Sequence, residues 1–250
     1  LAKSARIVPT QLEFVDIAGL VRGANQGEGL GNKFLSHIRD VDAIVNVLRC
    51  FEDDGVTHVE GSVDPVRDAE IIATELLIAD LESLERRVDA TTKRAAGGER
   101  DAKDNLRIMK PILAALQEGK PARSVSIDAA DQKRLDMLQL LTAKPVLYVC
   151  NVEEESAATG NSLSARVASF ASKQGSEAVI ISAKIEAEIA MLADAEERAD
   201  FLETLGLMET GLDRIIKSGY RLLDLITFLT AGPKEARAWT VCQGAAAVDA

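Results

Sequence analysis

The residues best suited to chemistry stand at the ends of apolar, strand-like runs. Asp16 ends the run of residues 12–16, and Gly19 follows it in the pattern Asp-x-x-Gly. In open α/β sheets, ligands bind at the carboxyl ends of the strands. A carboxylate there can hold a water of a Mg²⁺ shell, and a glycine amide can donate to a γ-phosphate. The pattern predicts a nucleoside-triphosphate site, with a simple strand-ending turn as the alternative.

Four glycines lie within nine residues shortly after this pattern: Gly23, Gly27, Gly29 and Gly31. Glycine permits large backbone changes and close approach to a ligand. Such changes are typical of segments that switch between two conformations. The composition favours a switch segment leading into a helix over residues 31–40, with an ordinary glycine loop as the alternative.

A second candidate site follows the strand predicted over residues 145–150. There Asn151, Val152 and Glu154 stand where G-protein-like enzymes carry Asn-Lys-x-Asp, whose aspartate binds guanine through two hydrogen bonds. A glutamate is one methylene longer and does not keep that in-plane geometry, so guanine selectivity is not expected. The amide of Asn151 can match the donor and acceptor of adenine, with Val152 beside the base. Whether Glu154 contacts the base or only stabilises the loop stays open.

A third candidate is the triplet Ser182, Ala183 and Lys184, which follows the strand predicted over residues 178–181. The backbone amides of Ser-Ala-Lys triplets at this place commonly contact the base. Each short match is weak alone, but the order of the three motifs and their strand-end positions agree. We therefore expect this triplet to close the base pocket.

The elements that must position these residues follow an α/β pattern. Strands are predicted over residues 12–16, 43–48, 145–150 and 178–181, and continuous apolar strands that alternate with helices indicate a mostly parallel sheet. Between the strand pairs, helical periodicity runs over residues 64–94 and 101–117, interrupted by Gly97 and Gly98. This pattern predicts an antiparallel helical hairpin inserted into the α/β domain.

The tip of the predicted hairpin is rich in positive charge. Residues 86–110 hold eight Lys and Arg residues against four acidic residues. A local RNA-contacting surface and an ordinary solvated helix face both explain this pattern. The whole chain carries a net charge of −11, so any RNA contact must be local.

Composition sets the remaining limits. With 47% hydrophobic and 28% charged residues the chain is typical of globular proteins, and no long uninterrupted apolar run predicts a membrane span. A cytoplasmic location is the default expectation, and Cys50, Cys150 and Cys242 are expected to be buried, reduced thiols. Because the first residue is Leu1, we expect the chain to be part of a longer protein.

Several motifs together resemble the Obg-like ATPases of the YchF family. They are residues 13–24 (EFVDIAGLVRGA), 27–32 (GEGLGN), 49–52 (RCFE), 227–232 (TFLTAG) and the Asn-x-x-Glu at Asn151 and Glu154. The resemblance covers essentially the whole chain. It implies a P-loop NTPase-type α/β fold, an inserted helical coiled-coil domain and the start of a β-grasp (TGS) domain. It also implies a preference for ATP over GTP, a Mg²⁺ ion and association with ribosomes or their RNA.

The resemblance suggests domain boundaries. The nucleotide-binding domain is expected over residues 1–63 and 141–219, the helical insertion over residues 64–140, and the start of the TGS domain over residues 220–250. The family's Gly-x-x-x-x-Gly-Lys-Ser loop does not occur in the chain, so we expect that loop before Leu1.

The water-activating group is also assigned by resemblance. Leu20 follows Gly19 where Ras-like enzymes carry a glutamine, and an aliphatic side chain cannot orient water. The resemblance places the family's catalytic histidine at His58, whose imidazole could position water or accept its proton. Two alternatives stay open: a non-catalytic nucleotide-dependent switch on the ribosome or RNA, and an Obg- or Drg-like GTPase.

Overall fold

The computed structural model describes residues 4–17, 30–53, 55 and 61–246, without the side chains of residues 30–34. The chain divides into two compact units. The first comprises Leu1–Val15, Val45–Pro65 and Val146–Ala250, and the second comprises Asp16–Ile44 and Val66–Pro145.

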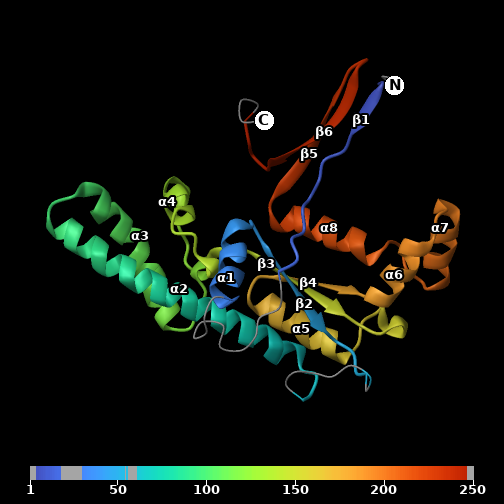
Figure 1. The fold of residues 1–250 in the computed structure, drawn as a ribbon, viewed down its shortest axis with the longest axis horizontal. Helices are drawn as coiled ribbons and strands as arrows, with labels where there is room; N and C mark the ends of the chain where they lie inside the picture. Colours follow the sequence, from blue (N-terminus) through green and yellow to red (C-terminus); the bar gives the residue numbers. More distant parts are fainter. Residues whose placement is uncertain (1–3, 18–29, 54, 56–60, 247–250) are drawn as a thin grey trace. The chain divides into compact units, whose positions relative to one another are not determined.

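The first unit is built on a sheet with the strand order β2 (Ile44–Arg49), β3 (Val146–Asn151) and β4 (Glu177–Ile181). Strands β3 and β4 are parallel, in register from Leu147 opposite Glu177 to Asn151 opposite Ile181. Successive side chains of a strand point to opposite faces of the sheet. All residues of β3 except the last are buried, so this strand is covered on both faces. Leu147 and Val149 pack with α8 (Gly211–Leu222), whereas the ring of Tyr148 contacts Phe170 of α5 (Ser162–Lys173) edge-on. Helices α8 and α5 lie on opposite faces of this sheet (Figure 1).

After β4 the chain forms α6 (Ala183–Met191) and α7 (Ala195–Thr204), which share a small apolar core centred on Ile185 and Ile189.

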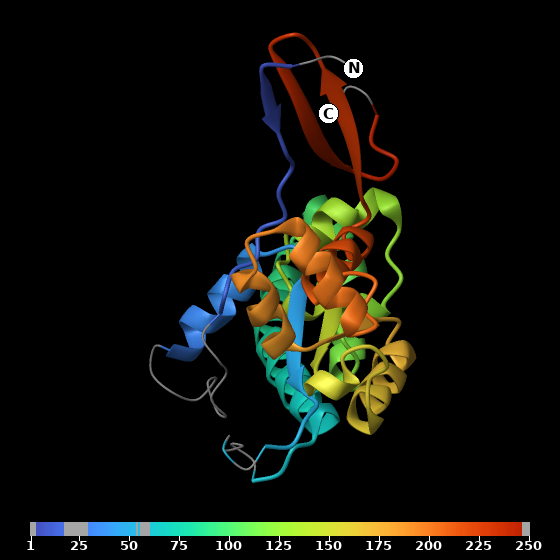
Figure 2. The same ribbon diagram turned by 90° about the vertical axis from the view of Figure 1, so that its right-hand side faces the viewer.

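A second sheet has the order β1 (Arg6–Val8), β6 (Glu235–Cys242) and β5 (Leu225–Ala231). Strands β5 and β6 form an antiparallel hairpin and β1 pairs with β6 in parallel (Figure 2). Whether this sheet begins a TGS domain stays a prediction.

The second unit contains α1 (Leu30–Asp40), α2 (Pro65–Ala96) and α3 (Arg100–Gln117). Helices α2 and α3 lie antiparallel (Figure 1). Gly98 between them has a φ of 93°, a conformation that favours glycine at a helix end. Their shared core includes Leu84, Leu106 and Ile112. Short helical turns follow: Ala122–Ser124, Ala129–Asp131, α4 (Gln132–Asp136) and Leu141–Ala143.

The mixed α/β class, the parallel sheet and the inserted helical hairpin are confirmed. The strand predicted over residues 12–16 is wrong, because residues 11–17 have no regular secondary structure. Phe14 and Val15 are about half exposed there. A strand needs a neighbouring strand for its backbone hydrogen bonds, and the local pattern shows only propensity. In the described part of the chain, none of the helices has the length and apolarity to cross a membrane.

Candidate nucleotide site

The base-reading motifs meet at one edge of the central sheet. Val152 directly follows β3, is buried, and donates its N–H to the carbonyl of Ile181 at the end of β4 at 2.8 Å. Parallel strands end at the same edge, so the segments after them lie side by side. The structure therefore brings Asn151 and Val152 next to Ser182 and Ala183.

A side-chain contact joins the two motifs directly. The Oδ1 atom of Asn151 accepts a hydrogen bond from the backbone N–H of Ala183 at 2.9 Å. Ala183 is the first residue of α6, so this bond satisfies one of the free N–H groups at a helix start. Among the described residues, the Nδ2 of Asn151 has no partner. Asn151 thus presents a donor, while one lone pair of its acceptor is already used.

Glu154 and Lys184 form an ion pair across the same edge. The Nζ of Lys184 lies 2.7 Å from Oε1 of Glu154, and the lysine side chain is 70% exposed. The hydrogen bond to Glu154 raises the pKa of Lys184. A pair this exposed contributes little to stability, but it gives the Glu154 carboxylate a preferred direction.

Ser182 differs from its neighbours because its hydroxyl is buried without a partner. The residue is 3% exposed, and its Oγ makes no hydrogen bond to the described part of the chain. A buried, unpaired hydroxyl is costly, and a bound ligand or a displaced side chain could satisfy it.

Sequence reasoning missed the network that fixes this loop. Asn161 begins α5 with a capping box to Ser164, and its Nδ2 donates to the Cys50 carbonyl at 2.6 Å and to Glu153 Oε2 at 2.9 Å. Burial raises the pKa of Glu153, but hydrogen bonds from Ser156 and Asn161 outweigh it and hold that pKa below its usual value. The sequence signal was the Asn-x-x-Ser capping pattern at residues 161–164.

The loop after β2 is tied to the same network. The N–H of Cys50 donates to the Asn151 carbonyl at 2.8 Å. The guanidinium of Arg49 donates to the carbonyls of Phe51 at 3.0 Å and Asp53 at 3.1 Å and lies over the Phe51 ring. The backbone of this loop is therefore fixed as far as residue 53.

The cysteine prediction holds in part. Cys50 and Cys150 are free and buried, but Cys242 is exposed, so the expectation of burial was wrong for that residue. Cys242 closes β6, in a sheet whose strands are largely solvent-accessible on both faces. Contact with the Cys150 thiol and burial raise the pKa of Cys50.

The phosphate end of the predicted site is described only through Asp16. Gly19 and His58 lie outside the described residues. Asp16 is exposed, and its carboxylate makes no hydrogen bond or ion pair within the described part of the chain. Its neighbour Ile17 packs against the core of the second unit, together with Leu35 and Leu76. An exposed carboxylate that no described residue pairs with can bind Mg²⁺ directly or through a bridging water, because Mg²⁺ prefers hard oxygen ligands.

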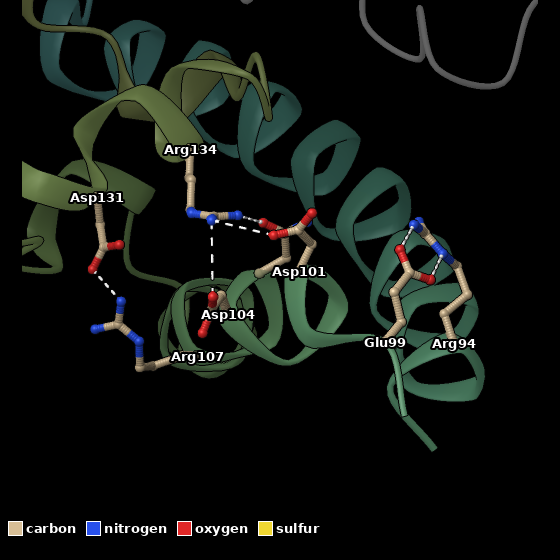
Figure 3. A network of polar contacts seen from close by, with 8 residues as sticks. Arg94, Glu99, Asp101, Asp104, Arg107, Asp131 and Arg134 are labelled. Atoms are coloured by element: carbon tan, nitrogen blue, oxygen red, sulfur yellow. Dashed lines mark hydrogen bonds and ion pairs between the residues drawn. The ribbon is translucent and has the colours of Figure 1, made fainter. Parts of the chain in front are cut away.

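Some cations of the charged hairpin tip are paired with acidic side chains, as Figure 3 shows, and others are not. Arg94 binds Glu99, Arg107 lies 2.6 Å from Asp131, and Arg134 of α4 lies within 4 Å of both Asp101 and Asp104. The exposed cations that make no ion pair with any described residue are Arg86, Lys93, Arg100, Lys103 and Lys110. The last three share one face of α3, because they are spaced by three and seven residues.

Comparison with known proteins is consistent with this geometry. Residues 2–78 match the family model of the 50S ribosome-binding GTPases. The chain is 48% identical to the ribosome-binding ATPase YchF of Bacillus subtilis, over 98% of this chain and 67% of the relative. It is 51% identical to the protein of the same name from Haemophilus ducreyi, over 97% of this chain and 66% of the relative.

A solved structure agrees as well. The YchF GTPase of Schizosaccharomyces pombe superposes with a TM-score of 0.85 at 34% identity, over 99% of this chain and 67% of that one. The chain thus spans about two thirds of the length of the proteins that it resembles.

Proposed function

Because this chain belongs to the YchF family of P-loop NTPases, we propose that the full-length protein is a ribosome-associated, Mg²⁺-dependent nucleotide hydrolase that prefers ATP to GTP. The observation that carries this proposal is the edge of the sheet at which Asn151, Ala183, Glu154 and Lys184 meet. Ribosome binding by relatives also favours a cytoplasmic location.

A purine base would bind at this edge of the sheet. Asn151 is held by Ala183 through its oxygen, so its Nδ2, which bonds to no described residue, can donate to an acceptor on the base. Both adenine and guanine carry such an acceptor at N7. Asn151 therefore anchors either purine, and the expected bidentate match to adenine would require its oxygen to be shared with Ala183.

The preference for ATP then depends on the residues beside Asn151. Guanine presents donors that an in-plane carboxylate can accept, but the Glu154 carboxylate is directed toward Lys184 at 2.7 Å. Reading guanine would require this ion pair to break and the longer side chain to fold back. Val152 stands in place of the lysine and is buried, so it offers the base no lysine stem. The hydroxyl of Ser182 and the backbone of Ala183 and Lys184 complete the pocket.

Hydrolysis is assigned to the other end of the site. Asp16 would hold the Mg²⁺ ion through water, Gly19 would contact the γ-phosphate and His58 would position the attacking water. The bound ion supplies charge neutralisation at the phosphates. The support for Asp16 is its exposed carboxylate, which no described residue pairs with, and the support for Gly19 and His58 is the family relationship.

A partner surface is proposed on the hairpin. Arg100, Lys103 and Lys110 form an exposed basic stripe on α3. Arg107 and Arg134 are instead paired with acidic side chains, as Figure 3 shows. A stripe of unpaired cations on an otherwise acidic chain suits the phosphate backbone of ribosomal RNA.

Two measurements on the full-length protein test the function. Unlabelled ATP should displace a fluorescent ATP analogue at lower concentration than GTP does. Single-turnover hydrolysis should release phosphate from ATP with Mg²⁺, and ribosomes are expected to change its rate. Equal or better competition by GTP would contradict the base assignment. Binding without hydrolysis, with and without ribosomes, would instead establish a non-catalytic switch.

A further inference from the structure

Helix α1 shares one apolar core with the base of the helical hairpin. Leu35 and Ile38 of α1 pack with Leu76 and Ala79 of α2, around the fully buried side chain of Leu141. Ile17, which follows Asp16, packs against the same cluster. Ile17 and helix α1 are therefore attached to the base of the hairpin within one compact unit.

The carboxylate of Asp80 and the hydroxyl of Thr142 hold the turn that contains Leu141. The carboxylate of Asp80 on α2 is 1% exposed and accepts hydrogen bonds from the N–H of Leu141 at 2.9 Å and the N–H of Thr142 at 2.7 Å. It also accepts from the Thr142 hydroxyl at 2.6 Å, which in turn accepts from the N–H of Ala122 at 3.0 Å. A buried carboxylate with three donors fixes the position of the turn relative to α2.

The other end of this turn holds α1. The ammonium of Lys144 donates to the carbonyls of Arg39 at 3.0 Å and of Val41, at the C-terminal end of α1. These carbonyls have no partner inside the helix, and a cation is favourable at this end of the helix dipole. Burial lowers the pKa of Lys144, and the nearby carboxylates of Asp42 and Asp40 oppose that shift.

We infer that Asp80 and Lys144 are positioning residues that clamp α1 to the hairpin, so that α1 and the hairpin move as one body when the bound nucleotide changes. The turn of residues 141–144 is the clamp, with one end fixed to α2 and the other to the end of α1. The inference rests on the proposed function, since it assigns a nucleotide-dependent position to α1. By thermodynamic linkage, a partner bound to the hairpin would in turn bias the phosphate-sensing segment.

Distances between spin labels in the full-length protein test this inference. The background is Cys242→Ser, because Cys242 is exposed whereas Cys50 and Cys150 are buried. One pair of labels, at His37→Cys and Ala114→Cys, reports on α1 against α3. A second pair, at Ala114→Cys and Ser172→Cys, reports on the hairpin against α5. All three sites are exposed.

With ADP and with a non-hydrolysable ATP analogue, the first distance should stay constant while the second changes. In Lys144→Met the first distance should broaden or become nucleotide-dependent. Lys144→Arg, which keeps a cation for the carbonyls, should restore the parent behaviour. Thr142→Val, which removes one donor to Asp80, should loosen α1 in the same way as Lys144→Met.

Three results would overturn the inference: a nucleotide-dependent first distance in the parent protein, an unchanged second distance, or Lys144→Met and Thr142→Val variants that both behave as the parent does. Calorimetric ATP binding and phosphate release, measured on the same samples, report separately on the proposed function. Were ATP not bound, amide hydrogen exchange would still test the clamp, because α1 should lose protection in Lys144→Met. Equal protection would refute it.

Discussion

The backbone N–H of Ala183 donates to Oδ1 of Asn151 at 2.9 Å, so the segment after β3 and the first turn of α6 are joined before any base is bound. Replacing Asn151 with Ala removes the donor to the base and leaves the Ala183 N–H without its acceptor. We expect affinity for ATP and GTP to fall by about 5- to 150-fold, equivalent to about 1–3 kcal/mol, with little change in their ratio. Isothermal titration calorimetry on the full-length protein measures both. Asn151→Asp is the matched control, because it keeps the acceptor for Ala183 but loses the donor; affinity retained in that variant would contradict the assignment.

The ion pair between Glu154 and Lys184 leads to a prediction about specificity. The double substitution Val152→Lys and Glu154→Asp restores the guanine-reading pattern and removes the longer carboxylate from Lys184. We expect the ratio of GTP to ATP affinity to rise by at least about tenfold, within the range that paired hydrogen bonds to a base supply. Competition binding measures the ratio. Lys184→Met alone controls for loss of the ion pair, and a ratio unchanged in the double variant would place base selection elsewhere.

Gly160 is a position at which the backbone and its neighbours both require glycine. Its φ is 76°, and an added Cβ would lie 2.7 Å from Ile180 Cδ1 and from Ser164 Oγ. Gly160→Ala should lower the free energy of unfolding by about 2–4 kcal/mol, since left-handed strain and overpacking each cost on the order of 1–3 kcal/mol. Gly175→Ala is the control, because its φ is 67° but no atom lies within 4 Å of the added Cβ. Gly175→Ala should lower the free energy of unfolding only through the strain of a left-handed backbone, by about 1–2 kcal/mol. Urea unfolding of the chain measures both, and equal losses would show that no steric contact exists at Gly160.

The basic stripe on α3 predicts a defined loss of ribosome affinity. Reversing Arg100, Lys103 and Lys110 to Glu should weaken binding at least about tenfold and reduce its salt dependence, because phosphate contacts and their released counterions are lost. Co-sedimentation with ribosomes at several salt concentrations measures this. A control triple, Lys133, Lys173 and Lys234 to Glu, makes the same charge change at exposed sites on α4, on α5 and in the β5–β6 turn. If both triple variants lost the same ribosome affinity, the loss would follow from net charge and not from the stripe on α3.

His58 is predicted to contribute to ATP hydrolysis but not to ATP binding. His58→Ala in the full-length protein should lower kcat at least tenfold, because general-base or water-orienting groups contribute about 10²–10⁴-fold. ATP affinity should stay nearly unchanged, as expected for an interaction made only in the transition state. Single-turnover kinetics and calorimetry separate the two effects. Wild-type hydrolysis by the variant would assign water activation to another group.

The amino-acid sequence by itself determined the local elements and the strand ends that carry the base-reading residues. Hydrophobic periodicity is a local property, so the helices of the hairpin, the break at Gly97 and Gly98, and strands β2, β3 and β4 were predicted within a few residues. The proximity of Asn151 to the Ser182 triplet was also predictable, because parallel strands end at one edge of a sheet.

Only the tertiary structure decided which of these groups are already engaged. The Asn151 oxygen is held by Ala183, Glu154 by Lys184, and Glu153 by Asn161. The two partners of each pair lie too far apart in the sequence for a local hydrophobic pattern to reveal their contact. Residues 12–16 have the composition of a strand but form none, since a strand requires a paired neighbour. Asp80 has the pattern of an ordinary helical acid, yet it is buried, because the turn at residues 141–142 brings three donors to it. Burial and pairing depend on residues far apart in sequence, and their outcome follows from the folded chain as a whole.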